Sequence, residues 1–382
     1  MTEKQPCYYL VCTAAGLNYG DDLIAAAWLR YLAEKQPGAD ITVDSVMPEV
    51  AQSTLGGIHP STRFTDTLWM TCFDSPDPEP LAVSSFVNQA IGHPGRIPSR
   101  AADIERMARA DVVHLVGGGF LNGLFQWTFG LPAGIVAATQ RSGGRAVMTG
   151  QCFCPAPPEP VVKHLRELAE QFALVDVRDE ASASLLGIDT VNLSVDDVFL
   201  SVGPGMYQHG AGAPQVMVCA HTDTTPGLTG RATVSELAEF VLKTLSHWEV
   251  KEEDVGFLEC FPGLDHKVFE SVKQRLPGAR FYGLYEILGT GLPVAEGQCW
   301  ISTRFHPHLV AAAAGMPGVA LSVIPEYYDV KHRSLISQGS GWQLLSNLSV
   351  PSRPTRGGFP QDRLKSYAAE KHRIADLIYA AD

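Results

Sequence analysis

Arg304 and His306 flank one phenylalanine where a short β-like stretch, 300–303, meets an alanine-rich segment typical of a buried helix. An arginine at the mouth of a buried strand needs an anion, because an unpaired buried charge is costly. The helix N-terminus and Arg304 both disfavour the imidazolium form of His306, whereas a bound polyanion favours it. We therefore expect His306 to gain a proton as an anionic ligand arrives, as a general acid must. The alternative is a half-buried structural histidine, and His308 is expected to pack rather than react.

Two other predicted strand ends carry groups suited to an anion. Arg178 ends an apolar strand, and its planar guanidinium matches a carboxylate or a phosphate. The alternatives there are a local ion pair and a cap supplied by Asp179 to the next helix. The glycines 117–119 let the backbone approach a ligand closely, although their G-x-G-x-x-x-G spacing differs by one residue from the dinucleotide fingerprint. A tight structural turn is the alternative for these glycines.

A fourth strand end carries Asn18, Asp21 and Asp22 before a helical segment. One carboxylate at this place is explained by helix capping and by the helix dipole. Two adjacent carboxylates cannot both cap the helix. We therefore expect one of them, Asp21 or Asp22, to face a ligand as a base.

The elements that position these groups alternate between strand and helix. In such parallel sheets, ligands bind beyond the carboxyl ends of the strands. The predicted fold is α/β, with two doubly wound Rossmann-like domains facing a cleft in the manner of the glycosyltransferase-B fold. The predicted strands are 8–15, 111–116, 145–150, 173–178, 216–223, 255–260, 299–303 and 319–324, and the predicted helices include 131–140, 233–247, 265–275 and 307–314.

A turn-rich segment, 203–214, is the predicted domain boundary. The predicted parts are an N-terminal domain over 1–205, a C-terminal domain over 206–350, and a linker with an amphipathic helix over 351–382. The apolar stripe of that helix is expected to hold Leu364, Tyr367, Ala368, Ile374, Leu377 and Ile378.

Composition excludes several classes of protein. The chain has 382 residues and a formal net charge of -12, which argues against nucleic acid as a partner. No signal peptide is expected, because the N-terminus lacks a basic region followed by an apolar one. No transmembrane segment is expected, because the longest apolar stretch, 309–325, is interrupted by glycine and proline. The expected location is cytoplasmic, beside the inner face of the membrane if the substrate is lipid-linked. The eight cysteines follow no metal-binding spacing, so they are expected to be reduced and mostly buried and to hold no metal.

In order along the chain, several motifs resemble those of the polysaccharide pyruvyl transferases. They are NYGDD, VGGGFLN, TGQCFCP, VDVRDEASASLL, the DD of LSVDDVF, and ISTRFHPHLVAAAAGMPGVALSV followed by YYDVKHRSL. The resemblance covers roughly residues 16–335. It implies a glycosyltransferase-B-like fold and transfer of pyruvate from phosphoenolpyruvate (PEP) onto two hydroxyls of a sugar, giving a cyclic ketal and phosphate. The implied partners are PEP and a saccharide or lipid-linked saccharide acceptor, and the implied reaction needs no cofactor.

The resemblance also implies roles for individual residues. Arg178 and Arg304 would grip the carboxylate and phosphate of PEP, and His306 would protonate its enol carbon. The chemistry of this reaction also needs a base for the sugar hydroxyl, and the residues offer Asp21 or Asp22, with Asp21 as the first choice. The other substrate-binding residues would be Asn18, Gly118, Gly119, Gln151 and Lys331. The chain departs from the family at His221, where members often carry an arginine, and at FPGLDH around Asp265, which matches only loosely.

Two other functions fit the same residues. A glycosyltransferase that uses a nucleotide sugar would employ the same arginine and glycines on a diphosphate, with Glu326 on the ribose. A non-catalytic binding protein would use Arg304 for its ligand and have no need of His306. The sequence specifies neither the acceptor sugar, nor the hydroxyl pair and ketal stereochemistry, nor the oligomeric state.

Overall fold

A computed structural model describes residues 5–203, 205–210, 212–222 and 232–380. The chain forms two compact units. The first unit comprises Met1–Gly16, Asp21–Ser201 and Tyr367–Asp382, and the second comprises Leu17–Gly20 and Val202–Ser366. The predicted boundary lies between residues 205 and 206, within a few residues of the observed division. Pro204 and Ala211 of the predicted boundary segment, and Asp223 of a predicted strand, lie outside the described residues.

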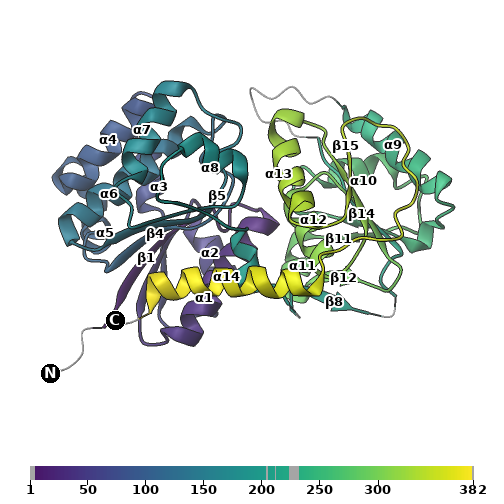
Figure 1. Ribbon diagram of the computed structural model, residues 1–382, viewed down its shortest axis with the longest axis horizontal. Helices are drawn as coiled ribbons and strands as arrows, with labels where there is room; N and C mark the ends of the chain where they lie inside the picture. Colours follow the sequence, from purple (N-terminus) through teal and green to yellow (C-terminus); the bar gives the residue numbers. More distant parts are fainter. Residues whose placement is uncertain (1–4, 204, 211, 223–231, 381–382) are drawn as a thin grey trace. The chain divides into compact units, whose positions relative to one another are not determined.

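The first unit is built on a seven-stranded parallel sheet in the order β3-β2-β1-β4-β5-β6-β7. Its inner strands are continuous apolar runs because both faces are covered by helices. In Figure 1, α4, α6 and α7 cover one face, and α1 and α14 cover the other. The strands are β1 (Cys7–Val11), β2 (Asp40–Asp44), β3 (Thr62–Thr65), β4 (Val112–Leu115), β5 (Arg145–Gln151), β6 (Leu174–Val177) and β7 (Val191–Leu193). The helices are α1 (Tyr19–Lys35), α2 (Pro48–Leu55), α3 (Thr67–Phe73), α4 (Pro80–Gly92), α5 (Ala101–Met107), α6 (Gly130–Ser142), α7 (Glu159–Ala169), α8 (Glu180–Leu186) and α14 (Gln361–Tyr379).

The second unit repeats this plan with a six-stranded parallel sheet in the order β11-β10-β9-β13-β14-β15. A two-stranded sheet of β12 and β8 lies beside it in the same unit. The strands are β8 (Tyr207–His209), β9 (Val216–Cys219), β10 (Val255–Leu258), β11 (Arg280–Tyr282), β12 (Leu292–Val294), β13 (Cys299–Ser302), β14 (Gly318–Leu321) and β15 (Gln343–Leu345). The helices are α9 (Val234–His247), α10 (His266–Val272), α11 (Leu284–Thr290), α12 (Phe305–Ala313) and α13 (Pro325–Ser337). Short 3-10 helices occur in both units. The first unit contains η1 (Pro94–Arg96), η2 (Pro98–Arg100), η3 (Gln126–Phe129) and η4 (Asp197–Leu200), and the second contains η5 (Glu252–Asp254).

Both sheets have the strand order of a doubly wound fold, which confirms the predicted α/β class with two Rossmann-like domains. The direction of winding reverses between β1 and β4 in the first sheet and between β9 and β13 in the second. Ligands of such sheets bind where the order reverses, at the carboxyl ends of the strands. The loops after these four strands are therefore the places to look for a site. No helix in the described part of the chain is long and apolar enough to cross a membrane.

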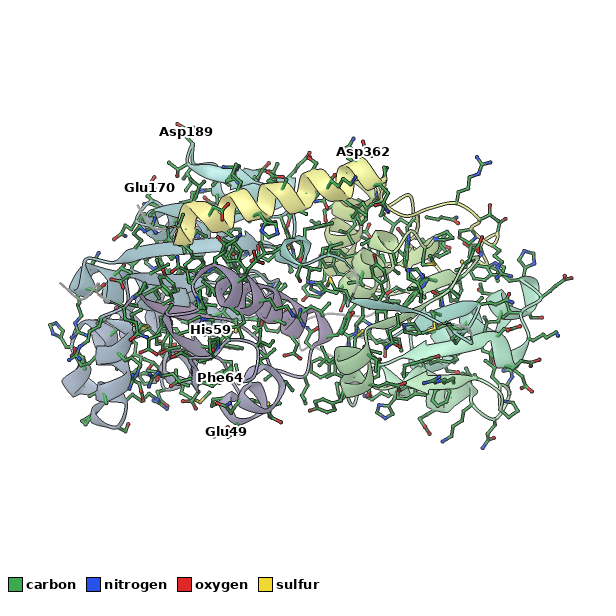
Figure 2. All side chains as sticks on the ribbon, turned by 90° about the horizontal axis from the view of Figure 1, so that it is seen from below. Glu49, His59, Phe64, Glu170, Asp189 and Asp362 are labelled. Carbon is green, nitrogen blue, oxygen red and sulfur yellow. The ribbon has the colours of Figure 1, made fainter. Side chains whose placement is uncertain are left out.

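The C-terminal helix α14 is part of the first unit from Tyr367 on, whereas the sequence predicted a separate appendage. The reason is its buried face, which carries Lys371, Ile374 and Ile378. Leu377, predicted on the apolar stripe, is 57% exposed, so that assignment is wrong. Lys371 lies on the buried face of the helix, where its ammonium forms ion pairs with Asp176 and Asp197. Figure 2 shows how densely side chains fill the two units, with Asp362 at the exposed start of the same helix.

A buried hydrogen-bonded chain joins β4, β5 and α14 through His114. Thr149 donates to Asp197 (2.5 Å), so its oxygen accepts from Nε2 of His114 (2.8 Å). Nδ1 of His114 then accepts from the hydroxyl of Tyr379 (2.8 Å). Both ring nitrogens are thus used by a neutral imidazole. Burial lowers the pKa of His114 to about 3.

This histidine gives the first testable prediction. The unfolded chain binds a proton at His114 below about pH 6.5, while the folded chain does not until far lower pH. Its contribution to stability is therefore present above pH 6.5 and is lost as the pH falls toward 3. We expect His114→Gln to be less stable than the wild type at pH 7.5. The difference in the free energy of unfolding between the two proteins should be smaller by about 2 kcal/mol at pH 5. Urea unfolding at the two pH values measures this difference, and the same difference at both pH values would contradict the prediction.

Candidate functional site

The first-unit site is the set of loops after β4, β5 and β6, where Gly118, Gln151 and Arg178 were predicted to bind substrate. Gly118 forms a bridge with Gln151, and its carbonyl accepts from the Cys152 N–H (2.9 Å). A side chain at Gly117 would come within 2.6 Å of the Asp197 carboxylate, so the glycine is required for this close packing. The predicted residues Gly118 and Gln151 are therefore brought together in one unit.

Gln151 is fully buried, and its amide donates to three backbone carbonyls, those of Leu115, Val116 and Thr149. These bonds hold β5 against the end of β4. Gly119 lies in the same loop, and its carbonyl accepts from the Asn122 side chain (2.7 Å). In this structure the side-chain amide of Gln151 therefore binds the backbone at the ends of β4 and β5.

Arg178 lies at the end of β6 with its side chain 4% exposed. It donates to Asp196 at 2.5 Å, and Asp196 also accepts from the backbone N–H of Val198. Burial lowers the pKa of the guanidinium, but the charges of Asp196, Cys152 and Asp179 and the hydrogen bond to Asp196 together raise it above its usual value. Asp179 caps α8 by accepting from Ser182 N–H (2.8 Å). Both structural alternatives considered for this pair are present, and the anion next to Arg178 is a protein carboxylate.

The loop after β1 has two backbone conformations rare outside glycine, and Asp22, in the first turn of α1, contacts this loop. Ala15 and Leu17 both have φ of 61°, a conformation that costs of order 1 kcal/mol for such residues. Asp22 is 3% exposed and accepts from the Ala15 N–H at 2.7 Å, which holds the strained turn. Burial raises the pKa of Asp22 to about 6. The side chain of Asn18 caps α1 by accepting a hydrogen bond from the Gly20 N–H (3.2 Å). The capping residue is therefore neither Asp21 nor Asp22. The role of Asp21 as a base stays a prediction.

The second-unit site contains Arg304 at the end of β13. Its Nε and Nη2 bind the carboxylate of Asp265 at 2.5–2.9 Å, and Asp265 also accepts from the backbone N–H groups of Cys260 and Phe261. Asp265 is fully enclosed, while the Arg304 side chain is 12% exposed. Within the described residues, Nη1 of Arg304 makes no hydrogen bond. One edge of the guanidinium is thus fixed and the other is available to a ligand.

His306 lies in the first turn of α12, as predicted, and is half-buried against Gly20. A Cβ atom at Gly20 would lie 1.7 Å from Nδ1 of the imidazole and 2.3 Å from Cγ. The Tyr19 N–H donates to the carbonyl of Cys260 (2.9 Å), which anchors the start of α1 in the second unit. The glycine thereby makes the space in which the ring of His306 lies.

Three other residues of the second unit that the sequence singled out, His308, Lys331 and His221, are buried. His308 contacts His332 and Ser340 and stacks on Trp342 (4.2 Å), so its predicted packing role is confirmed. Lys331 is 6% exposed, and its ammonium lies 3.4 Å from the centre of the Tyr327 ring on α13.

His221 follows β9 and is hydrogen-bonded to Thr303 (2.6 Å) and the Tyr328 hydroxyl (2.9 Å). Burial, and then the charge of Arg304, lower its pKa. It therefore stays neutral beside Arg304, where an arginine would place a second positive charge.

Sequence reasoning missed Asp265 and Gly20. Asp265 was visible only in a loosely matching segment, and it lies 39 positions before the arginine that it binds. Gly20 gave no signal because a glycine at the start of a helix looks like a neutral choice. Both act through Arg304 or His306, so both position the groups predicted to do chemistry.

The fold of the whole chain is shared with two solved structures. A protein assigned as UDP-N-acetylglucosamine 2-epimerase from Listeria monocytogenes is 11% identical, with a TM-score of 0.53 over 98% of this chain and 89% of the other. The UDP-GlcNAc 2-epimerase from Neisseria meningitidis, bound to UDP-GlcNAc, is 10% identical, with a TM-score of 0.53 over 99% and 95%. These similarities show the fold alone. The protein thus has the glycosyltransferase-B type of fold, as predicted.

The family follows from the sequence. The polysaccharide pyruvyl transferase model matches residues 18–245, more than half of the chain. The chain belongs to the polysaccharide pyruvyl transferase family. The match includes Arg178 and Gln151 but ends before Arg304 and His306, whose roles stay predictions. No curated protein matches the chain.

Proposed function

We propose that this protein transfers pyruvate from PEP to two hydroxyls of a saccharide, forming a ketal and releasing phosphate. Membership of the family supports pyruvyl transfer to a polysaccharide. The observation that carries the assignment of the site is the second-unit geometry. Arg304 is fixed by Asp265 with one edge available, and His306 lies two residues on, at the start of α12.

The chemistry needs an acid, a base and an anion clamp. His306 gives its proton to the methylene carbon of PEP, which leaves an oxocarbenium centre on the carbon that bears the phosphate. One sugar hydroxyl adds to that carbon and loses its proton, phosphate leaves, and the second hydroxyl closes the ring. Of the two hydroxyl protons, one restores the acid and one leaves with phosphate. Nη1 of Arg304 and the N-terminus of α12 stabilise the anion.

A binding experiment tests the donor. PEP is titrated into the purified protein by calorimetry, with UDP as comparator. We expect Arg304→Lys to weaken PEP binding by about 10- to 100-fold, since a charged hydrogen bond contributes about 1.5–3 kcal/mol. The lysine keeps a cation beside Asp265, which avoids an unpaired buried carboxylate, but it lacks the planar fork.

The matched control is Arg275→Lys, an exposed arginine of the same unit paired with Glu239. It should bind PEP like the wild type. Binding of UDP without any response to PEP would instead favour a glycosyltransferase that uses a nucleotide sugar, with the exposed Glu326 of α13 as the candidate ribose ligand. If Arg304→Lys and Arg275→Lys bind PEP equally well, Arg304 is not part of the donor site.

We propose Asp21 as the base, because its carboxylate lies in the first turn of α1, at the end of the loop that follows β1. Asp21→Asn is expected to lower phosphate release from PEP by about 100-fold or more, the usual contribution of a general base. A panel of methyl glycosides serves as acceptors. PEP affinity should change little, and unchanged phosphate release would exclude Asp21 from this role.

A further inference from the structure

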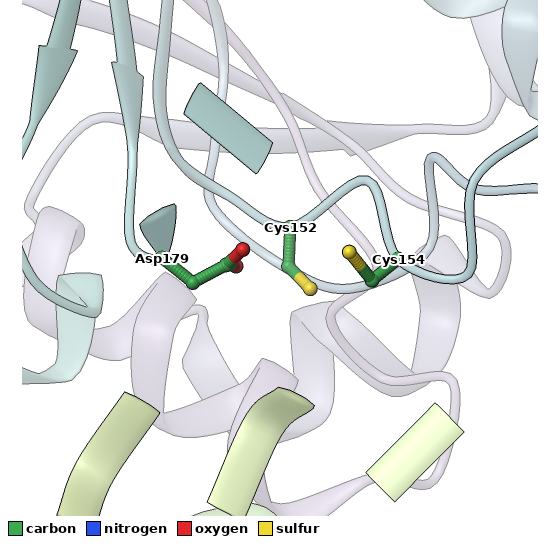
Figure 3. Close-up of side chains that lie close together, drawn as sticks. All are labelled: Cys152, Cys154 and Asp179. Atoms are coloured by element: carbon green, nitrogen blue, oxygen red, sulfur yellow. The ribbon is translucent and has the colours of Figure 1, made fainter. Parts of the chain in front are cut away.

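Three metal-ligating side chains converge at the carboxyl edge of the first sheet. Cys152 follows β5, Cys154 comes two residues later, and Asp179 follows β6. Their ligand atoms all lie within 4.8 Å of one another, and all three residues are buried. Figure 3 shows the Cys152 sulfur between the Asp179 carboxylate and the Cys154 sulfur. We propose that Cys152, Cys154 and Asp179 bind a thiolate-preferring divalent cation such as Zn²⁺.

The ligand set suits this class of metal. Two thiolates and a carboxylate are typical zinc ligands, and soft sulfur excludes Mg²⁺ and Ca²⁺ as preferred occupants. Zinc–sulfur and zinc–oxygen bonds of about 2.0–2.3 Å place tetrahedral ligands about 3.4–3.8 Å apart. Ligand atoms within 4.8 Å therefore need only small rotamer shifts. Three protein ligands leave a fourth position for water or another small ligand.

The surroundings already orient these ligands. Oδ1 of Asp179 accepts from the Ser182 N–H (2.8 Å), which leaves its second oxygen for a cation. The Ser182 hydroxyl accepts from the Phe153 N–H (2.9 Å), which fixes the loop between the two cysteines. Such second-shell bonds commonly orient metal ligands.

When no cation is present, ionisation of the two thiols and the carboxyl group is unfavourable, because they are buried close together. A hydrogen bond with Cys152 and then burial raise the pKa of the Cys154 thiol. Burial and then the Cys152 charge raise the pKa of Asp179 to about 7. A divalent cation would relieve this by displacing the protons of both thiols, as metal binding to cysteine generally does. The nearby charge of Arg178 is already compensated by Asp196 (2.5 Å).

A second cluster provides a natural comparison. Cys219, Cys260 and Asp265 in the second unit also lie within 4.8 Å of one another. There, however, the Arg304 guanidinium occupies both oxygens of Asp265, and two backbone N–H groups share one of them. A cation already satisfies that carboxylate. The proposal is therefore confined to the first unit, and the second cluster supplies the control.

The test is direct metal binding by the reduced, metal-free full-length chain. Titration with Co²⁺ should give one equivalent bound and a thiolate-to-cobalt charge-transfer absorption, which Zn²⁺ then abolishes by displacement. Cys154→Ser should remove the charge-transfer band or cut it strongly, and Asp179→Asn should weaken binding at least tenfold. Asparagine keeps the cap of α8, so this variant is expected to fold normally. Cys219→Ser should bind like the wild type.

Three results would overturn the proposal. They are less than stoichiometric binding by the wild type, a band that persists in Cys154→Ser, and a band that disappears in Cys219→Ser. Loss of two titratable thiols on air oxidation in the wild type and in Cys219→Ser but not in Cys154→Ser, without any metal binding, would identify Cys152 and Cys154 as a disulfide pair instead. Neither PEP nor an acceptor is present, so the outcome is independent of the proposed function.

Discussion

Replacing Lys371 by methionine is expected to destabilise the first unit by about 3–5 kcal/mol, the usual cost of breaking a buried ion pair from one side. The Lys371 ammonium lies 2.6 Å from Asp176 and 2.8 Å from Asp197, and all three side chains are fully buried. Burial alone would lower the pKa of Lys371, but the two carboxylates raise it above its usual value. The variant leaves both aspartates buried without their cation.

The same centre joins most of the first-unit site. Asp197 also accepts from Trp28 (2.8 Å), Thr149 and the N–H of Gly117. Asp176 accepts from the N–H of Gly150 (2.9 Å). One lysine from the C-terminal helix therefore fixes the loops after β4 and β5, and its loss is expected to loosen both.

Two further variants make the measurement specific. Lys365→Met changes an exposed lysine of the same helix and should stay within about 0.5 kcal/mol of the wild type. Adding Asp176→Asn to Lys371→Met removes one of the orphaned charges and should restore part of the stability. Urea unfolding gives all three values. A loss below about 1 kcal/mol for Lys371→Met would show that the buried cation has no stabilising role.

The elements around the site were predictable because they are buried. The runs RAVMTG and the segment 299–303 correspond to β5 and β13, whose residues are almost wholly enclosed. The edge strands β7, β8 and β15 were not predicted. Each has three residues with partly or fully exposed side chains, so none shows an apolar run.

The partners of the site residues were less predictable than the residues themselves. Arg304 and Arg178 were recognised from their positions at strand ends, but Asp265 and Asp196 were not recognised as their partners. Each partner comes from a loop after another strand, and only the sheet order brings it close. The cluster of Cys152, Cys154 and Asp179 was not predicted for the same reason. Asp179 follows β6 and the two cysteines follow β5, and only the pairing of these strands brings them together.

The ion pairs of Arg178 and Arg304 affect the charge that the proposed PEP donor would meet. Arg178 and Arg304 each have a protein carboxylate as a permanent neighbour, at 2.5 Å in both cases. In the proposed reaction, a trianionic donor bound at either arginine would therefore meet a neutralised pair and not a bare cation. The proposed acid is His306, which lies two residues after Arg304 in the first turn of α12. The acid is thus expected to matter more to turnover than either arginine does.

Replacing His306 by glutamine is expected to lower phosphate release from PEP by about 10²- to 10⁴-fold, the usual contribution of a general acid. The amide keeps much of the size and polarity of the ring but cannot deliver a proton at neutral pH. Deuterium uptake into the PEP methylene in D₂O should fall in parallel, while PEP affinity should change only a few-fold. Phosphate release within threefold of the wild type would instead fit a binding protein in which His306 is dispensable.

Gly20→Ala tests the same group without removing it. The new Cβ would overlap the imidazole, so the ring must leave its place, and we expect phosphate release to fall at least tenfold. Alanine is a better helix former than glycine by about 0.5–1 kcal/mol, so the start of α1 should lose no intrinsic stability. Gly289→Ala in α11 is the matched control, since nothing lies within 4 Å of its added Cβ. Full activity in both glycine variants would mean that the ring position of His306 is not the one used in catalysis.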